Sequence, residues 1–140
     1  MEMLKSANGL IEFTIPGKPP RATGQMRKAV RTAAGVRFYD PPHVAAARKQ
    51  LLEGVKPYAP EVPLEGPVKL SCTWAFEAKR KKDCGTWKVT RPDTDNMQKL
   101  LKDVMTLAGF WKDDAQVAME TCRKVWTGEP GIAISVELLN

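Results

Sequence analysis

Alternating apolar and polar positions mark the strands that the sequence predicts. The segments 10–15 and 68–76 both carry apolar residues at every second position. This period is typical of a half-buried strand, because successive side chains of a strand point to opposite faces. Two further strand-like runs, 115–126 and 132–138, are joined through a Gly-Glu-Pro-Gly segment, and we expect them to form an antiparallel hairpin.

A longer apolar period predicts two helices. The first covers residues 44–55 after a Pro-Pro pair, and the second covers 97–108, where apolar residues recur at i, i+3, i+4, i+7, i+8 and i+11. Gly109 is the expected end of the second helix. The element order predicts an α+β fold, with a small mixed or antiparallel sheet of about four strands and two helices packed on it, in a single domain over residues 1–140.

Positive charge is gathered into two segments, 16–39 and 78–92. Together they hold 12 of the 22 Lys and Arg residues but one of the 16 acidic residues, in a chain of net charge +6. Charge sorted in this way is typical of a surface that binds the phosphate backbone of nucleic acid, whereas a merely solubilising surface would intersperse both signs. We expect DNA contacts from Lys18, Arg21, Arg27, Lys28, Arg31, Lys79, Arg80, Lys81, Lys82, Trp87, Lys88 and Arg91. We also expect the segment 16–39 to be a loop that becomes ordered on a ligand or a partner subunit.

An acidic cluster surrounds the predicted second helix. Asp93 and Asp95 stand where the helix should begin, and Asp113-Asp114 follow its end. In an extended segment Asp93 and Asp95 share a face and repel by about 1–4 kcal/mol unless a cation lies between them. Oxygen ligands without a nearby His or Cys favour Mg²⁺ or Mn²⁺. If the next strand pairs beside the helix start, Asp114 or Asp113 reaches the same site, and Lys99, one turn after Asp95, can neutralise charge on a phosphate.

Each part of this cluster also has a structural interpretation. Asp95 and Gln98 have the spacing of a capping box, Asp95 and Lys99 that of an ordinary helical ion pair, and Asp113-Asp114 suit a turn. The combination in one short module favours a catalytic interpretation. The residues still leave open a metal-dependent nuclease that acts on another branched nucleic acid, and a non-catalytic DNA-binding module.

The motifs resemble those of the RusA family of Holliday junction resolvases. The resemblance is carried by Pro92-Asp93-Thr94-Asp95-Asn96-x-x-Lys99 and Trp111-x-Asp113-Asp114-x-Gln116-Val117, with Ile15-Pro16-Gly17-Lys18-Pro19 and Lys124 in agreement. It implies a homodimeric, Mg²⁺-dependent endonuclease of bacterial or phage origin that resolves four-way DNA junctions by paired symmetric nicks in recombination and repair. It also implies, by position, that Asp93, Asp95 and Asp114 are catalytic, metal-binding carboxylates, that Lys99 is a catalytic lysine, and that Asp113 is a further acid near the metal.

Other features narrow the class of protein. No stretch has the length and apolarity of a signal peptide or a membrane span, so we expect a cytoplasmic protein without a membrane partner or a small-molecule cofactor. The three cysteines lack the CxxC spacing of a zinc site, and we expect Cys72 and Cys122 to be buried thiols. His43 is expected to be a surface or capping residue, because metal-activated water needs no His. Two roles remain open for Trp87 in the second basic segment: it stacks on an unpaired base or wedges open the crossover, or it covers the core as aromatic residues in loops often do.

Overall fold

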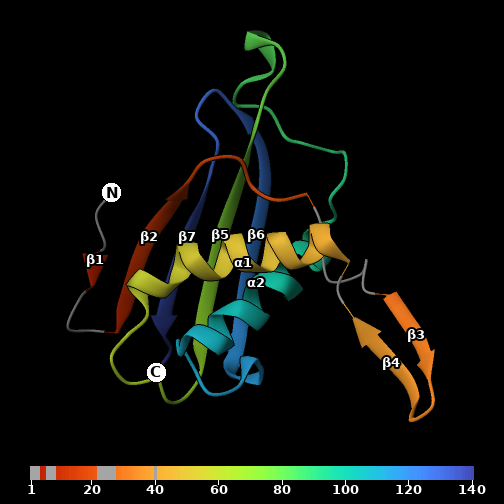
Figure 1. Ribbon diagram of the computed structural model, residues 1–140. Helices are drawn as coiled ribbons and strands as arrows, with labels where there is room; N and C mark the ends of the chain where they lie inside the picture. Colours follow the sequence, from red (N-terminus) through yellow and green to blue (C-terminus); the bar gives the residue numbers. More distant parts are fainter. Residues whose placement is uncertain (1–3, 6–8, 22–27, 40) are drawn as a thin grey trace.

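The computed structural model describes residues 4–5, 9–21, 28–39 and 41–140. It contains a mixed five-stranded sheet in the order β1-β2-β7-β5-β6, a separate two-stranded hairpin β3-β4, and two α-helices. In chain order the elements are β1 (Leu4–Lys5), β2 (Leu10–Pro16), β3 (Lys28–Thr32), β4 (Gly35–Tyr39), α1 (Pro42–Val55), η2 (Lys56–Tyr58), β5 (Val68–Glu77), η3 (Lys81–Asp83), α2 (Thr94–Ala108), η4 (Asp114–Gln116), β6 (Val117–Thr127) and β7 (Gly131–Leu138), where η marks a short 3-10 helix. Both α-helices cover the same face of the sheet (Figure 1). The predicted α+β class is therefore confirmed.

The central strand β5 organises the hydrophobic core. Its alternate residues Val68, Leu70, Cys72, Trp74 and Phe76 are at most 2% exposed. The strand pairs antiparallel with β7 on one side and parallel with β6 on the other. A row of side chains this apolar is buried only where strands flank it and helices cover it, and α1 and α2 supply that cover.

The predicted antiparallel hairpin between residues 115–126 and 132–138 is wrong. Both segments form strands, β6 and β7, but β5 lies between them in the sheet. β6 is parallel to β5, and α2 makes the crossover between these two strands. The short Gly- and Pro-containing connection suits either arrangement, so the local sequence does not reveal that a third strand intervenes.

One glycine ends α2, and another allows α1 to lie close to β2. Gly109 follows α2 with a φ of 91°, a left-handed conformation that glycine adopts without strain, and this confirms the predicted helix end. In α1, a Cβ on Gly54 would lie 2.8 Å from the side chain of Ile15 in β2. The helix therefore rests directly on the strand at a point where a larger residue would push them apart.

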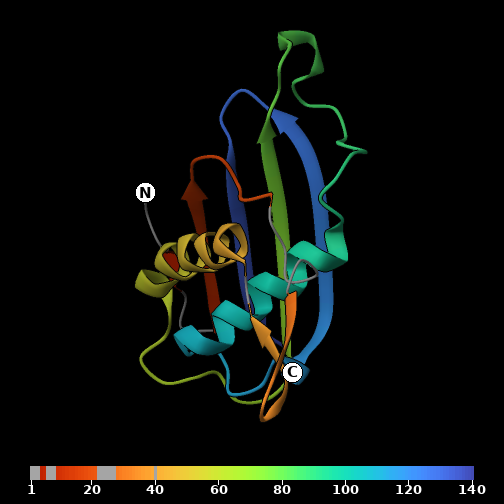
Figure 2. The ribbon, with the colours of Figure 1, turned by 45° about the vertical axis from the view of Figure 1, so that its right-hand side comes forward.

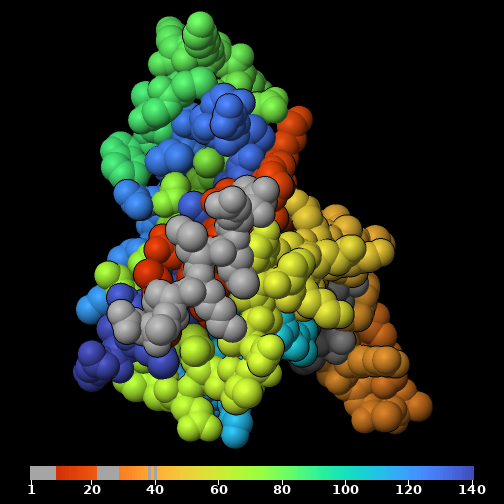
Figure 3. Space-filling model, turned by 90° about the vertical axis from the view of Figure 1, so that its left-hand side faces the viewer, coloured from red at the N-terminus to blue at the C-terminus, as the bar shows by residue number. Residues whose placement is uncertain are grey.

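The predicted basic loop over residues 16–39 is partly a β-hairpin, so that prediction needs correction. β3 and β4 pair antiparallel and project from the body of the protein as an arm (Figures 1 and 3), which is turned toward the viewer in Figure 2. Three of the apolar side chains on this arm, Val30, Val36 and Tyr39, are at least 42% exposed. A hairpin that buries so little apolar surface leaves no clear alternation in the sequence, which is why the pattern suggested a loop.

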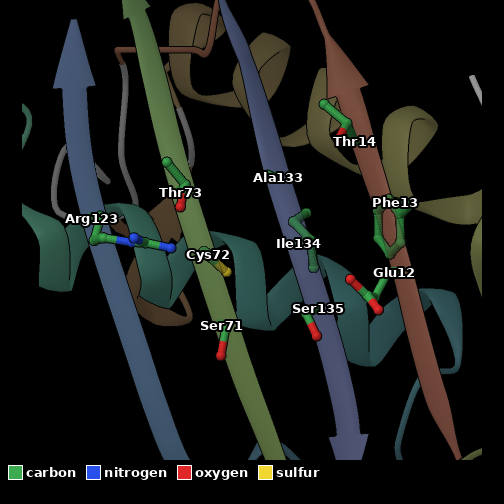
Figure 4. A pocket seen from close by; sticks show the side chains of 10 residues that line it. All are labelled: Glu12, Phe13, Thr14, Ser71, Cys72, Thr73, Arg123, Ala133, Ile134 and Ser135. Atoms are coloured by element: carbon green, nitrogen blue, oxygen red, sulfur yellow. The ribbon is translucent and has the colours of Figure 1, made fainter. Parts of the chain in front are cut away.

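The face of the sheet opposite the helices carries mostly small and polar side chains. A shallow hollow on it is bordered by Glu12 of β2 and Arg123 of β6, with Thr73 and Ser135 between them (Figure 4). None of the predicted catalytic residues lines this hollow. The candidate chemistry therefore belongs to the helical side of the sheet.

The burial of the cysteines agrees in part with the sequence predictions. Cys72 is buried as predicted, whereas Cys122 is half-buried and Cys84 is exposed, all three as free thiols. Burial raises the pKa of the Cys72 thiol and raises that of Cys122 to about 11. No helix among the described residues is long and apolar enough to cross a membrane.

Candidate active site

Asp93 and Asp95 lie together at the amino-terminal end of α2. Asp93 is the N-cap residue, and its carbonyl oxygen accepts a hydrogen bond from the backbone N–H of Met97 at 3.1 Å. Asp95 lies within the first helical turn rather than in an extended segment, which corrects the expected local geometry. Both side chains are exposed, and neither carboxylate has a hydrogen bond or an ion pair with a described residue. Their oxygens are therefore available to a ligand.

Of the alternative structural roles, neither the capping box of Asp95 with Gln98 nor the Asp95–Lys99 ion pair is formed among the described residues, whereas Asp95 does lie in the first turn of α2, where the helix dipole favours an acid. Gln98, the second member of the supposed capping box, is 4% exposed and turned into the protein. Its Oε1 accepts a hydrogen bond from Trp74 Nε1 at 2.7 Å, and its Nε2 donates to Glu120 Oε2 at 2.7 Å. Gln98 thus anchors α2 to β5 and β6. No ion pair joins Asp95 to the exposed Lys99 among the described residues.

A lysine of β6 fixes the segment that leads into α2. Lys124 Nζ donates hydrogen bonds to the carbonyl oxygens of Thr90 at 2.6 Å and Pro92 at 2.8 Å. Pro92 directly precedes Asp93, so β6 determines where the acid pair begins. The sequence gives no local signal for this role, because the contact joins residues more than 30 positions apart.

Asp113 and Asp114 lie at the opposite end of α2. They border a hollow together with Asp103, Thr106 and other residues of the last helical turns. The helix rises by about 16 Å between Asp95 and Thr106. Among the described residues, no three His, Cys, Asp or Glu side chains are grouped closely enough to hold a metal ion. The expected convergence of these acids within one chain is therefore wrong.

The parallel arrangement of β5 and β6 explains this separation. The chain leaves β5 at its carboxyl end, enters α2 there, and returns along the helix to the other end of the sheet before β6 begins. Asp93 therefore precedes the crossover helix and Asp114 follows it, with the whole length of the helix between them. The sequence pattern predicted both neighbouring elements correctly but not the direction in which they pair.

The two acids after α2 differ in their contacts. Asp113 Oδ1 accepts a hydrogen bond from the backbone N–H of Ala115 at 2.8 Å, and Gln116 Oε1 accepts one from the backbone N–H of Asp113 at 3.3 Å. This capping box, with a further hydrogen bond from Gln116 Nε2 to Leu64 O at 2.9 Å, holds η4 against the preceding loop. The Asp114 carboxylate is exposed and has no partner among the described residues. Asp113 therefore has a structural role, whereas Asp114 is available to a ligand.

The two basic segments meet beside the start of α2. One cleft is lined by residues of both segments and by their neighbours: Arg21, Lys79, Arg80, Asp83, Thr86, Trp87, Lys88, Thr90 and Trp126. The segment 78–92 extends beyond the carboxyl end of β5 (Figure 1). Thr90 lies three residues before Asp93, so the cleft opens next to the acid pair. This places positive charge where a phosphate backbone would pass the two carboxylates.

Most of the predicted DNA contacts are exposed. These residues are Lys18, Arg21, Arg31, Lys79, Arg80, Lys81, Lys82, Trp87 and Arg91, with Trp87 66% exposed. Arg27 and the side chain of Lys28 lie outside the described part of the chain. His43 is exposed near the start of α1, which agrees with the predicted surface position.

Lys88 differs from the other predicted DNA contacts. Its side chain is 3% exposed, its Nζ lies 4.3 Å from the centroid of the Trp126 ring, and it donates a hydrogen bond to Thr90 Oγ1. Burial lowers the pKa of Lys88, and the neighbouring charges of Arg21 and Lys124 lower it further. An ammonium enclosed in this way does not reach a phosphate, so its placement argues against the predicted DNA contact.

The acid pair suits a hard divalent cation. Mg²⁺ commonly takes one or two protein carboxylates and completes its shell with water and substrate phosphate. Asp93 and Asp95 supply two exposed carboxylates of this hard-oxygen type. The residues at the start of α2 therefore fit a Mg²⁺ ion that is shared with a substrate.

Comparison with known proteins decides the family. The family model for endodeoxyribonuclease RusA matches residues 16–137. This chain belongs to the RusA family. The crossover junction endodeoxyribonuclease rusA of Lactococcus phage r1t is 34% identical to it over 120 residues, which cover 81% of this chain and 86% of that protein. The resemblance inferred from the motifs is thus confirmed, and the matched range includes both the acid pair and Asp113-Asp114 of this RusA-family chain.

Proposed function

We propose that this RusA-family chain is a metal-dependent endonuclease that resolves four-way DNA junctions by paired, symmetric nicks. The observation that carries the proposal is the exposed, unpaired Asp93 and Asp95 beside a cleft lined by both basic segments. DNA held in this cleft would present a phosphodiester to carboxylates that can bind a cation. The name of the phage relative supports a crossover junction as the substrate.

The acidic residues at the two ends of α2 and the lysine in its first turns have distinct roles in this proposal. Asp93 and Asp95 would hold Mg²⁺, with Mn²⁺ as an alternative, whereas Asp114, at the other end of α2, does not reach this pair within one chain. When bound, such an ion activates a water molecule and stabilises negative charge on the phosphate. Lys99, one turn after Asp95, neutralises charge that develops on the leaving oxygen. Asp113 positions the turn that carries Asp114 and does not bind the ion.

The exposed basic residues bind the DNA backbone in this proposal, so affinity should fall steeply with salt. Trp87 stacks on a base at the junction, where pairing is incomplete.

A homodimer would present one site to each of two opposed strands, because a four-way junction has approximate two-fold symmetry. Residues 1–140 would act as one catalytic domain in the cytoplasm of a bacterial cell, during recombination and repair of bacterial or phage DNA.

A nicking assay on two matched DNA substrates tests the proposal. The protein is incubated with a labelled four-way junction or with a linear duplex of the same length and sequence, with and without Mg²⁺. We expect symmetric nicks in the junction with Mg²⁺ present, no nicks in the duplex, and no nicks by Asp93→Asn. Cleavage of the duplex at the same rate would contradict junction selectivity. Binding without nicking in any divalent metal would instead indicate a DNA-binding module.

A further inference from the structure

Lys88 is a buried lysine in the cleft beside the acid pair. Its side chain is 3% exposed and lies between two aromatic rings, with Nζ 4.3 Å from the centroid of Trp126 and 5.1 Å from that of Phe76. No carboxylate pairs with it among the described residues. Asp83, the acid that lines the same cleft, forms an ion pair with Arg80 at 3.0 Å. Lysine is rarely buried without an anionic partner, so the burial of this one requires an explanation.

The ammonium of Lys88 destabilises the folded protein. Burial lowers the pKa of Lys88, and the charges of Arg21 and Lys124 lower it further. At neutral pH the folded state therefore disfavours the ammonium relative to the unfolded state, in which the pKa has its ordinary value. Methionine, an apolar side chain of similar length, would avoid this cost and packs well against aromatic rings. The stability of the fold therefore does not explain a lysine at this position.

The hydrogen bond of the Lys88 ammonium is made to the segment that leads to Asp93. Nζ of Lys88 donates to Oγ1 of Thr90, which lies three residues before Asp93. The carbonyl oxygen of Thr90 accepts a second hydrogen bond, from Nζ of Lys124 at 2.6 Å. Two lysines from different segments thus hold Thr90, one at its side chain and the other at its backbone.

Within the described part of the chain, side-chain hydrogen bonds hold the last residues before α2. Backbone pairing of this segment with β6 ends at Lys88, whose N–H donates to the carbonyl oxygen of Lys124 at 3.0 Å. No backbone–backbone hydrogen bond among the described residues involves residues 89–92, and the next one joins the N–H of Met97 to the carbonyl oxygen of Asp93. The course of residues 89–92, and with it the position of the Asp93 carboxylate, therefore depends on Lys88 and Lys124.

We infer that Lys88 is a positioning residue of the nicking reaction, because it holds Thr90 and thereby the Asp93 carboxylate. The inference rests on the proposed function. Lys88 contacts neither the DNA nor the cation and acts through Thr90, while Lys124 holds the backbone of the same segment. The two aromatic rings confine the ammonium, so it keeps the Thr90 side chain in one orientation. A loss of stability that improves the geometry of an active site is a common compromise in enzymes.

Lys88→Met separates this role from a purely structural one. Single-turnover nicking of the four-way junction in Mg²⁺, junction affinity and Tm are measured on the same sample. We expect the rate at saturating protein to fall about tenfold, since a displacement of about 1 Å near reacting groups can cost on the order of 100-fold. Junction affinity should stay within about twofold of the parent, because the interaction that is lost serves the reaction and not binding. Tm should equal or exceed that of the parent, because a buried charge is removed.

Thr90 offers a matched pair of variants. Thr90→Val removes the hydroxyl and keeps the shape of the side chain, whereas Thr90→Ser keeps the hydroxyl. We expect Thr90→Val to lower the nicking rate about as much as Lys88→Met does, and Thr90→Ser to recover most of the lost rate. The double variant Lys88→Met with Thr90→Val should nick at about the rate of either single variant, because both substitutions remove the same hydrogen bond.

The outcomes distinguish this inference from the proposed function. If the parent protein does not nick junctions in Mg²⁺, the proposed function fails and the positioning role fails with it. If the parent nicks and Lys88→Met nicks as fast, the positioning role alone is overturned. The same holds if the losses of Lys88→Met and Thr90→Val add up in the double variant. A loss of junction affinity that accounts for the whole loss of rate would overturn the role as well, and would assign Lys88 to DNA binding.

Discussion

Lys124→Met tests how the fold positions the acid pair. The ammonium of Lys124 donates to Thr90 O at 2.6 Å and to Pro92 O at 2.8 Å, and methionine keeps most of the hydrocarbon chain while donating nothing. A hydrogen bond from a charged group contributes about 1.5–3 kcal/mol where it is shielded from water. Because the site is partly exposed, we expect a total loss of about 1–3 kcal/mol in the free energy of unfolding. This corresponds to a decrease in Tm on the order of 3–10 °C.

The effect of Lys124→Met on nicking should exceed its effect on binding. Release of the segment before Asp93 displaces the carboxylates, and a displacement of about 1 Å near reacting groups can cost on the order of 100-fold in rate. We expect single-turnover nicking of the junction to fall at least about tenfold, with junction affinity nearly unchanged. Lys69→Met is the matched control, because the side chain of this strand lysine has no partner among the described residues, and it should behave as the parent. Parental nicking by Lys124→Met, or an equal loss of nicking and binding, would refute the positioning role.

Three further predictions concern the core, the DNA surface and the thiols. Gln98→Leu leaves Trp74 Nε1–H without an acceptor and should lower the free energy of unfolding by about 1–3 kcal/mol, as measured by denaturant unfolding. A Gln98→Leu variant as stable as the parent protein would contradict the anchoring role. Substitution of both Lys81 and Lys82 by Ala should reduce the slope of log affinity for junction DNA against log salt concentration by about 1–2. Lys88→Met should leave this slope unchanged, because the ammonium of Lys88 is buried. A reduced slope for Lys88→Met would show that this ammonium does contact phosphate. Iodoacetamide at pH 8 should modify the exposed Cys84 first, since Cys122 has a pKa of about 11 and that of Cys72 is raised, and mass spectrometry should detect one fast thiol rather than two. The pKa of Cys122 is higher in the folded than in the unfolded protein, so the thiol ionises first in the unfolded state. The free energy of unfolding should therefore fall as pH rises from about 9 to about 11, and this fall should be smaller in Cys122→Ala.

The parts of the fold that the sequence predicted correctly are those with strong local periodicity. β5 and α2 each bury one regular row of apolar side chains, so their patterns alone define their type and approximate limits. Gly109 could be assigned for a similar reason, because the residue that ends a helix in a left-handed conformation is usually glycine. These features depend on neighbouring residues only.

The parts that the sequence did not predict depend on contacts between distant segments. The parallel pairing of β6 with β5 rather than with β7 determines that Asp114 lies far from Asp93, and no local pattern encodes that choice. The β3–β4 arm was missed because its apolar side chains are largely exposed. In the sequence Lys88 is indistinguishable from the other basic residues of its segment, because the Phe76 and Trp126 rings that enclose it come from distant strands. Function was predicted better than geometry, since a family motif keeps its residues and spacing whatever the pairing of the strands around it.

The central claim is that Asp93 and Asp95 form the reactive centre of a junction-nicking enzyme. The most direct measurement is the single-turnover rate at which Asp95→Asn nicks a four-way junction in Mg²⁺, taken with the junction affinity of the same sample. We expect nicking to fall below detection while affinity stays at the parental level or increases, because a negative charge facing the phosphate is removed. A variant that nicks the junction as fast as the parent would contradict the claim.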